Sequence, residues 1–333
     1  MTTDFVLGLF HEGAAQTVAA IVLFLIGLVL IVKGGDVFVN SATWMAEASG
    51  IPKFIVGATI VSVATTLPEL IVSCIAASKG AGYTSMAIGN AIGSVTVNTG
   101  MIMGISLLFA PMVIRRREIG VKGFLMVFSV LALTLLCWDG NLTLMQAILM
   151  LLLFVAFIVE NVYGASQNKE ITQREPIVKS TLWKNILLFV VGAAALAYGS
   201  TLLVDNGEFL AHAVGVDDRI IAITLVAIGT SLPELVTAVT AIVKKQGTMS
   251  VGNILGANII DITVILPVCA LISGGTIRAE NLDSVRIDMP ICLLETAIAV
   301  IPTLIFKKFS RWQGAVMVLV YLAYIAYSIV VLA

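Results

Sequence analysis

The sequence predicts an all-α membrane protein in which ten transmembrane helices form two inverted five-helix repeats. Two observations predict this fold class. Hydrophobic residues make up 59% of the 333 residues and charged residues only 12%, and apolar stretches of about 20 residues recur along the chain. In addition, motifs of the first half return in the second half, which indicates an internal duplication.

Hydropathy and helix-breaking residues place the boundaries of the spans. The ten predicted spans cover residues 16 to 46, 52 to 78, 84 to 110, 120 to 138, 143 to 164, 184 to 214, 218 to 243, 248 to 273, 288 to 306 and 313 to 332. Residues 1 to 12 contain no Lys or Arg, so the positive region of a secretory signal is missing. We therefore expect the first span to remain in the protein.

The duplication is clearest in one long segment and one short segment. Residues 27 to 69 align with residues 192 to 234 without a gap, at an offset of 165. GNAIGS, which begins at Gly89, then matches GNILGA, which begins at Gly252, at an offset of 163.

An odd number of helices in each half requires the second half to enter the membrane upside down. Such an inverted repeat places a site near the bilayer midplane, where the halves meet. The expected division is a first repeat at residues 1–165, a polar cytoplasmic link at 166–183 and a second repeat at 184–333.

The positive charges predict the orientation of the chain. One side of the predicted topology carries 14 basic residues: Lys53, Arg115, Arg116, Arg117, Lys122, Lys169, Arg174, Lys179, Lys184, Lys244, Lys245, Lys307, Lys308 and Arg311. The other side carries 4, namely Lys79, Arg219, Arg278 and Arg286. Because positively charged loops stay in the cytoplasm, both termini are expected outside.

Each half places one carboxylate inside an apolar span, directly after a proline. The two segments are VATTLPE, which ends at Glu69, and AIGTSLPE, which ends at Glu234. Thr65 and Thr230 precede these glutamates by four residues, so each hydroxyl shares a helix face with a carboxylate. A proline also leaves a carbonyl without its helical hydrogen bond about one turn earlier. Carboxylate, hydroxyl and carbonyl oxygens are the ligands that calcium or sodium prefers.

The second repeated segment adds further oxygen ligands at helical spacing. It contributes Ser94 and Asn98 in the first half, and Ala257 and Asp261 at the matching places of the second half. The glycines of this segment recur every four residues, which lets helices pack closely. Since the only basic residues in the spans of the two glutamates, Lys53 and Arg219, stand at the ends of those spans, a functional role is favoured over a structural ion pair.

Other classes of function find no support. The chain has 19 basic and 20 acidic residues and shows no basic surface for nucleic acid. Cys74, Cys137, Cys269 and Cys292 lie singly in apolar stretches, which is typical of core residues and not of a zinc site or a disulfide framework. We expect no cofactor. An intramembrane enzyme is a remote alternative, because His11 begins no HExxH motif.

These motifs resemble those of the cation/calcium exchanger superfamily, most closely its prokaryotic sodium/calcium exchanger branch. The resemblance covers nearly the whole chain, through the ten-helix plan and both repeated segments. It implies a secondary active antiporter that exchanges calcium for sodium by alternating access, in which the first and sixth helices slide across a core of four helices. Carried over by position, the implied ligands are the side chains of Thr65, Thr66, Glu69, Ser94, Asn98, Thr230, Ser231, Glu234 and Asp261 and the backbone carbonyls of Ser62 and Ala227.

The chain departs from the family pattern at a few positions. Ala64 and Thr66 replace the usual Gly and Ser, and the hydroxyl at residue 66 is kept. Ala257 stands where many members have Ser, so one hydroxyl ligand is lost and sodium affinity or stoichiometry should change. If Asp261 is neutral, exchange of three sodium ions for one calcium moves one net charge. A potassium-dependent sodium/calcium exchanger stays open as an alternative, because such relatives carry an Asp at this place.

A calcium/proton antiporter of the same superfamily is the other alternative. Those relatives typically carry a glutamate where this chain has Gly93 and Gly256, which favours sodium coupling. The expected partners are calcium, sodium and the lipid bilayer of a prokaryotic plasma (inner) membrane, and a monomer is consistent with the sequence. Lys33 and Asp36 are expected to form a local ion pair in the first span. Glu295 lies alone in the ninth predicted span, outside both repeated motifs.

Overall fold

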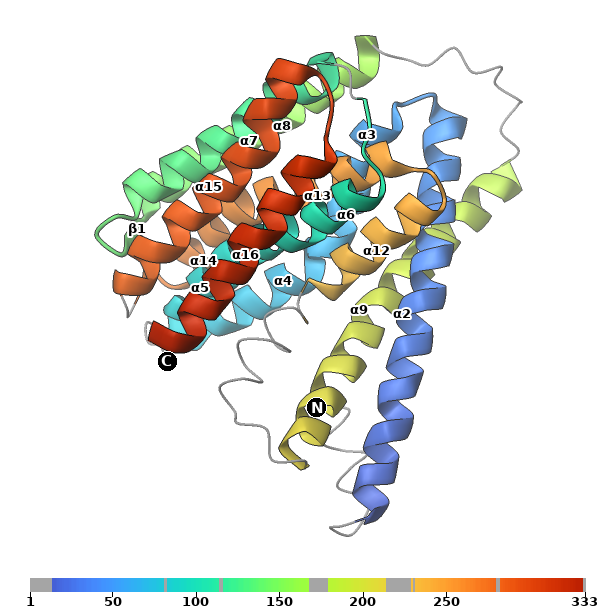
Figure 1. Cartoon of the computed structure of the whole chain (residues 1–333), viewed down its shortest axis with the longest axis horizontal. Helices are drawn as coiled ribbons and strands as arrows, with labels where there is room; N and C mark the ends of the chain where they lie inside the picture. The colour runs from blue at the N-terminus through green and yellow to red at the C-terminus, as the bar shows by residue number, and fades with distance from the viewer. Residues whose placement is uncertain are drawn as a thin grey trace.

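The structure, a computed structural model, describes residues 14–80, 83–113, 116–167, 179–213, 229, 231–279 and 282–331. Over these residues the chain is helical except for one small antiparallel sheet (Figure 1). Its strands, β1 (Asn141–Thr143) and β2 (Thr276–Arg278), pair with Leu142 opposite Ile277. The sheet joins a loop of the first half to a loop of the second half, and it was not predicted.

Eight helices in the described part of the chain are long and apolar enough to cross a membrane. They are built from α2 (Ala14–Ser49), α3 (Lys53–Val56) continued by η1 (Gly57–Val61) and α4 (Ser62–Ser78), α5 (Thr84–Thr96) continued by η3 (Val97–Met103) and α6 (Gly104–Phe109), α7 (Arg116–Leu136), α8 (Leu144–Gln167), α9 (Lys179–Ala213), α13 (Gly247–Ile260) continued by η5 (Asp261–Ile265) and α14 (Leu266–Ile272), and α15 (Leu282–Phe306). The prediction of a helical membrane protein is confirmed.

Two further helices correspond to the remaining predicted spans. The first is α12 (Leu232–Val243), which covers the end of the predicted span 218 to 243; the beginning of that span lies outside the described residues. The second is α16 (Arg311–Val331), close to the predicted span 313 to 332. Two helices begin earlier than predicted, α7 at Arg116 and α9 at Lys179. Because α9 begins at Lys179, it extends into the predicted 166–183 link.

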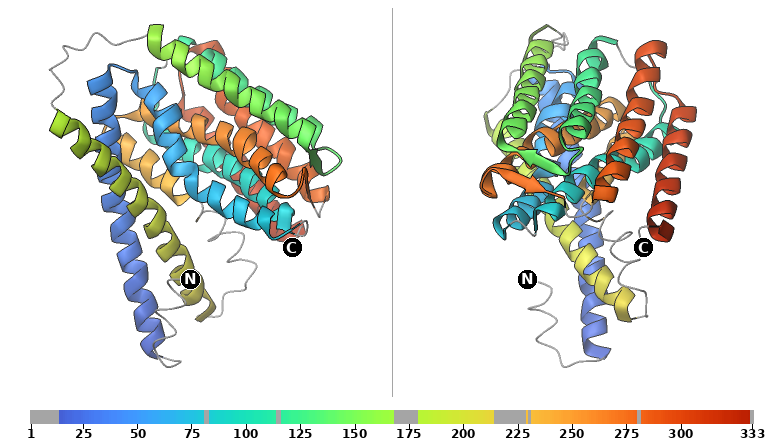
Figure 2. Two further views of the ribbon diagram at one scale, coloured as in Figure 1. Left: turned by 180° about the vertical axis from the view of Figure 1, so that it is seen from behind. Right: turned by 90° about the vertical axis from the view of Figure 1, so that its left-hand side faces the viewer.

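Helices α2 and α9 form an arm that extends away from the other helices (Figures 1 and 2). They run antiparallel and touch through glycines, because a Cβ at Gly27 would lie 2.9 Å from the Gly199 carbonyl oxygen and one at Gly34 would lie 3.2 Å from that of Gly192. Such contacts allow close backbone approach and leave the outer faces apolar and exposed. Only 17% of the most apolar stretch of α2 is buried, as suits a helix surrounded by lipid.

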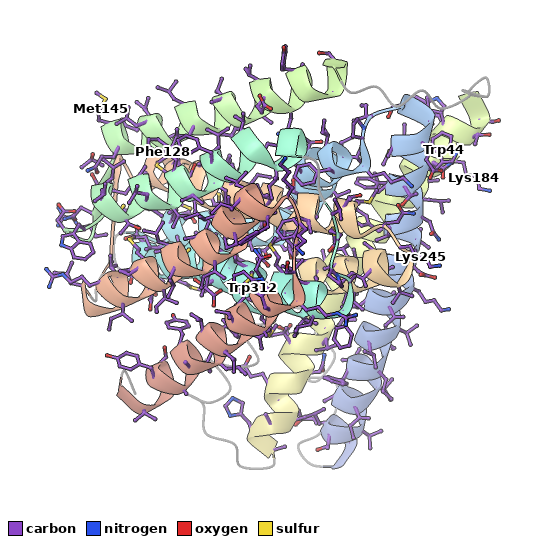
Figure 3. The ribbon with its side chains drawn as sticks, turned by 45° about the horizontal axis from the view of Figure 1, so that its top comes forward. Trp44, Phe128, Met145, Lys184, Lys245 and Trp312 are labelled. Atoms are coloured by element: carbon purple, nitrogen blue, oxygen red, sulfur yellow. The ribbon has the colours of Figure 1, made fainter. Side chains whose placement is uncertain are left out.

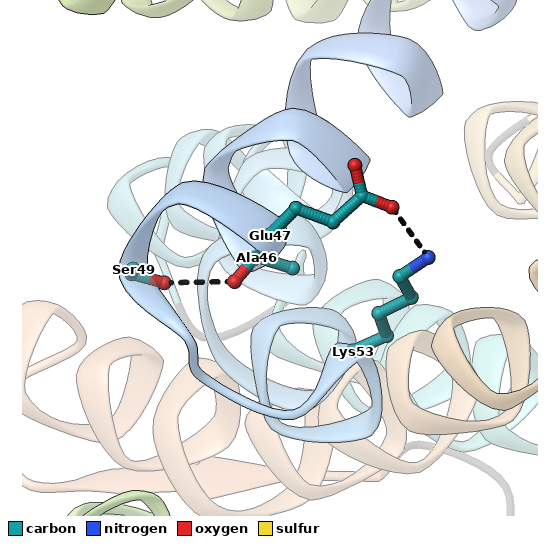
Figure 4. Close-up of polar contacts among 4 residues, drawn as sticks. All are labelled: Ala46, Glu47, Ser49 and Lys53. Atoms are coloured by element: carbon teal, nitrogen blue, oxygen red, sulfur yellow. Dashed lines mark hydrogen bonds and ion pairs between the residues drawn. The ribbon is translucent and has the colours of Figure 1, made fainter. Parts of the chain in front are cut away.

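The turn after α2 connects the arm to the core. It is closed by an ion pair between Lys53 Nζ and Glu47 Oε1 at 2.8 Å and by a hydrogen bond from Ser49 Oγ to the Ala46 carbonyl at 3.2 Å (Figure 4). Gly50 turns the chain with a φ of 67°, a backbone conformation that side chains disfavour.

The predicted pair of Lys33 and Asp36 is wrong. Asp36 instead pairs with Lys244, which follows α12, at 2.9 Å, and Lys244 also donates a hydrogen bond to Asn40. A long lysine from the core outcompetes a neighbour on the same helix because it reaches two acceptors of α2 at once.

The core is centred on α13 and its continuation. In this element 83% of the most apolar stretch is buried, and α13 packs on α3, η1, α4, α12 and α7. Backbone meets backbone where α13 crosses η1, because a Cβ at Gly57 would overlap the Met249 carbonyl and a Cβ at Gly252 would overlap that of Phe54. The packing role predicted for the four glycines of the repeated segment is confirmed for Gly252 and Gly256. It is wrong for Gly89 and Gly93, where no described atom lies within 4 Å of an added Cβ.

The outer helices α7, α8, α15 and α16 cover the core on the side away from the arm (Figure 2). Phe128 and Met145 point outward from α7 and α8, and Trp312 is half exposed on α16 (Figure 3). Apolar side chains on such outward faces suit contact with lipid tails.

Candidate functional site

The first repeated motif lies on the inward face of α4. Thr65, Thr66 and Glu69 are all buried, at 2%, 2% and 1% exposure. The hydroxyl of Thr66 donates a hydrogen bond to the Ser62 carbonyl at 2.7 Å, and that of Thr65 reaches the same carbonyl at 3.3 Å. Because each hydroxyl hydrogen is used in this way, the oxygen lone pairs remain available to a cation.

Glu69 lies one residue after Pro68, inside the continuous helix α4. No described residue donates a hydrogen bond to either of its carboxylate oxygens. Pro68 has no N–H, so the Ala64 carbonyl one turn earlier lacks its usual helical donor. The helix thus combines an unpartnered carboxylate with a loosened carbonyl, as the sequence predicted.

The second motif begins α12. Ser231 is the N-cap residue, and Glu234 lies in the first turn of the helix. Both are completely buried, and no described residue donates a hydrogen bond to the Ser231 hydroxyl oxygen or the Glu234 carboxylate. Two predicted ligands of this motif, Ala227 and Thr230, lie outside the described residues.

The second repeated segment supplies three more residues with unpartnered side-chain oxygens, next to these helices. Ser94 is on α5 and Asn98 is the second residue of the π-helical turn η3, while Asp261 is the first residue of the equivalent turn η5. All three are buried, and Ser94 Oγ, Asn98 Oδ1 and both Asp261 oxygens find no hydrogen-bond partner in the described chain. Ala257 is buried at the place where a hydroxyl is missing.

These elements pack on one another, so the predicted residues that the structure describes lie in one region. Helix α4 contacts α5, α12, α13 and η5, and η3 contacts α12 and α13. Glu69, Glu234 and Asp261 are close enough for their negative charges to act on one another. No described lysine or arginine forms an ion pair with any of them. Mutual repulsion without a protein counter-charge makes this region attractive to cations.

The three acids do not by themselves form a closed metal centre. Among the described residues, no group of three or more His, Cys, Asp or Glu side chains is arranged to hold a metal ion. A site for calcium or sodium here must therefore draw most of its ligands from hydroxyls, carbonyls and amides, which these cations accept.

Sequence reasoning missed three asparagines, two of which connect the halves. Asn253 of α13 accepts a hydrogen bond from Thr65 Oγ1 at 3.3 Å and donates one to Thr237 Oγ1 at 3.3 Å. Asn258 donates to Thr99 Oγ1 at 2.7 Å across the two halves. Asn90 bonds within its own half, to Ser73 Oγ at 2.9 Å. Asn90 and Asn253 occupy the same place of the repeated GN pair, which is the signal that could have identified them.

Comparisons with known proteins agree with this geometry. A model of the family described as sodium/calcium exchanger protein matches residues 19–163 and 184–330. The inner membrane protein YrbG of Escherichia coli is 34% identical over 259 residues, which cover 73% of this chain and 76% of that protein. The sodium/calcium exchanger MaX1 of Methanosarcina acetivorans is 28% identical over 283 residues, which cover 71% of this chain and 78% of that protein.

Solved structures give the same result for the fold. The sodium-calcium exchanger NCX_Mj, soaked with 10 mM Na⁺ and zero Ca²⁺, superposes with a TM-score of 0.80 at 28% sequence identity. The superposition covers 93% of this chain and 99% of that chain. With matches that extend over both halves of the sequence, the chain belongs to the sodium/calcium exchanger protein family.

Proposed function

We propose that this protein exchanges calcium for sodium across a membrane by alternating access. The observation that carries this proposal is the meeting of Glu69 and Glu234 from the two repeated motifs in a buried region without a described basic partner. Two carboxylates match the charge of one calcium ion, and the surrounding neutral oxygens suit sodium equally well. The names of MaX1 and NCX_Mj support the same pair of ions.

The proposed ligands are those that the sequence predicts. They are Thr65, Thr66, Glu69, Ser94, Asn98, Thr230, Ser231, Glu234 and Asp261, with the carbonyls of Ser62 and Ala227. The hydrogen bonds from Thr65 and Thr66 to the Ser62 carbonyl support this set, because they turn hydroxyl lone pairs toward the cluster. They also mean that the Ser62 carbonyl would serve a sodium ion and a hydroxyl together.

We further propose ten spans arranged as two inverted repeats, residues 1–165 and 184–333, joined by the 166–183 link. The contacts of the arm support this symmetry. In the alignment, Gly27 corresponds to Gly192 and Gly34 to Gly199. When the two halves are exchanged, the contact of Gly27 with Gly199 therefore becomes the contact of Gly192 with Gly34, which is the second contact observed. A two-fold axis in the membrane plane between antiparallel helices produces this pattern.

Alternating access then follows from the division between arm and core. Within the arm, α2 and α9 contact each other along their lengths. The arm contacts the core at α12, at α4 and at the turn before α3. Movement of the arm would change which side of the cluster is covered, without disturbing the tight glycine contacts of α13. The excess of basic residues supports a plasma (inner) membrane orientation with both termini outside.

A flux assay tests this function. Radioactive calcium uptake would be measured in proteoliposomes loaded with sodium, in the presence of a protonophore, for the native protein, Glu69→Gln and Glu47→Gln. The last variant is a control, because Glu47 is a half-exposed carboxylate in the turn after α2. Uptake that requires the outward sodium gradient, survives in Glu47→Gln and disappears in Glu69→Gln supports exchange. Uptake driven only by a pH gradient would instead indicate a calcium/proton antiporter. Uptake that requires potassium would indicate a potassium-dependent sodium/calcium exchanger.

A further inference from the structure

Helix α15 carries two carboxylates whose surroundings differ. Asp288 accepts a hydrogen bond from Tyr324 Oη of α16 at 2.9 Å. Glu295, two turns later, is completely buried, and in the described chain neither of its oxygens has a hydrogen-bond partner. At 1.5 Å per residue it lies roughly 20 Å along the helix from Leu282, far from either membrane surface. The buried acid is therefore unexplained by the ion cluster.

Glu295 packs against the back of η3. A Cβ at Gly100 would lie 2.9 Å from Glu295 Oε1 and 2.8 Å from Tyr321 Cβ of α16. Asn98 and Gly100 are two residues apart in this helical turn, so their Cα–Cβ directions point to nearly opposite sides. Glu295 thus lies behind the segment that presents Asn98 to the cluster, separated from it by one helix.

The titratable groups around Glu295 are few. Cys292, one turn earlier on α15, is close enough to sense the charges of both Glu295 and Asp261. Tyr321 lies beside the same Gly100. Helix α7 also packs on α15, with Gly123 against Val300, and its charged residues precede Gly123, on the side of this contact away from Glu295. Within the described chain, no cation is paired with Glu295.

The environment suits a proton and not a metal ion. Calcium takes six to eight oxygen ligands and sodium also needs several, whereas Glu295 has no described oxygen partner within hydrogen-bonding distance. The nearby hydroxyls of Thr96 and Thr296 donate to carbonyls of their own helices, at 2.9 and 2.7 Å. A proton requires only the carboxylate oxygen itself, and it removes the cost of a bare charge in the membrane.

We propose that Glu295 is a proton-binding site, separate from the ion cluster, whose occupancy opposes that of the cluster. When cations enter the cluster, their positive charge one helix away favours the carboxylate, so the O–H bond breaks, the electron pair stays on oxygen and the proton passes to bulk water. When the cations leave, Glu295 takes up a proton again. The effect on transport rests on the proposed exchange function, whereas the binding of the proton does not.

Infrared difference spectroscopy of the full-length protein tests the proton site directly. The carboxylic-acid C=O band would be compared in the native protein, Glu295→Gln and Asp288→Asn, each without ions and after addition of calcium. We expect one component of the acid band to be lost in Glu295→Gln, kept in Asp288→Asn and weakened by calcium in the native protein. A band unchanged in Glu295→Gln, or one that does not respond to calcium in a protein that binds it, would overturn the proposal.

Calcium uptake as a function of pH supplies the second readout. Above the midpoint of a single titrating site, its protonated fraction falls about tenfold for each pH unit. We therefore expect the native rate to vary with pH in a way that is flattened in Glu295→Gln and kept in Glu295→Asp and Asp288→Asn. Equal pH profiles in the native protein and Glu295→Gln would contradict coupling. Absence of calcium uptake in the native protein would instead refute the exchange function, and the infrared band would still decide the proton site.

Discussion

The two LPE motifs have nearly the same sequence but different local structures. In the first half Pro68 lies inside α4, and Glu69 follows it in a continuous helix. In the second half the helix begins at Leu232, so Pro233 and Glu234 lie in its first turn. A proline is well accommodated in a first turn because the missing N–H would have no helical partner there, whereas inside a helix it removes a hydrogen bond. One motif lies in a helix interior and the other at a helix start.

This difference makes the halves electrostatically unequal. The N-terminus of α12 favours the negative charge of Glu234, whereas Glu69 in mid-helix has no such support. The second half also carries Asp261 where the first has Asn98, and Ala257 where the first has Ser94. The second half thus supplies most of the charge and the first half most of the neutral oxygen. In the proposed site, the two repeated motifs thus have complementary contributions.

The largest expected effect comes from removing the charge of either glutamate. Glu69→Gln and Glu234→Gln should each reduce calcium uptake by about 100-fold or more, because calcium affinity depends strongly on the number of charged ligands. In the absence of ions, Glu69→Gln should raise the melting temperature more than Glu234→Gln does, since only Glu234 benefits from a helix N-terminus. Thermal unfolding of both variants in the presence of a chelator measures the order of their melting temperatures. A reversed order would contradict the electrostatic difference between the two halves.

The next effect concerns packing at the matching glycines Gly252 and Gly89. Gly252→Ala should lower the free energy of unfolding by about 1 to 3 kcal/mol, because its Cβ would overlap the Phe54 carbonyl. Gly89→Ala is the matched control, as no described atom lies within 4 Å of a Cβ there. Better helix propensity should leave Gly89→Ala neutral or up to about 1 kcal/mol more stable. Comparable destabilisation of both variants in chemical unfolding would show that the crossing is symmetric.

The candidate site residues could be selected from the sequence because their pattern is local. Thr65 and Glu69, or Ser94 and Asn98, are four residues apart, and helical periodicity alone places each pair on one face. The charge count was less accurate, since it groups Lys122 with the loop residues of one side although the predicted span 120 to 138 contains it. The structure buries Lys122 within α7, where its Nζ lies 5.7 Å from the centre of the Phe54 ring and 3.9 Å from Glu160 Oε1. A lysine with such partners can enter a helix bundle.

Contacts between distant residues were beyond prediction from spacing. Thr65 and Asn253 are 188 positions apart and meet only because α13 crosses the first half at Gly57. The same holds for the pairing of Asp36 with Lys244 and of β1 with β2. Each depends on how helices pack in three dimensions, which periodicity does not encode.

Asn253 offers a test of the connection between the halves. It receives the Thr65 hydrogen bond and donates to Thr237, which in turn donates to the Pro233 carbonyl at 2.6 Å. Asn253→Ala should weaken calcium binding by about tenfold, the equivalent of one lost buried hydrogen bond. Asn90→Ala should have a smaller effect, because Asn90 bonds to Ser73 within its own half. Calcium binding measured by calorimetry would contradict this account if Asn90→Ala were the more damaging change.

The smallest expected effect restores the missing hydroxyl. Ala257→Ser should increase sodium affinity by a few-fold, because one added ligand oxygen is worth about 1 kcal/mol after its own desolvation. The reciprocal change, Ser94→Ala, should decrease it by a similar factor, since Ser94 Oγ is buried without a partner in the described chain. The sodium concentration that half-inhibits calcium binding measures both variants. Opposite shifts of similar size would mean that a serine at either position is a sodium ligand. If only Ser94→Ala has an effect, the second half holds sodium without residue 257, and the asymmetry of the two halves extends to the number of sodium ions bound.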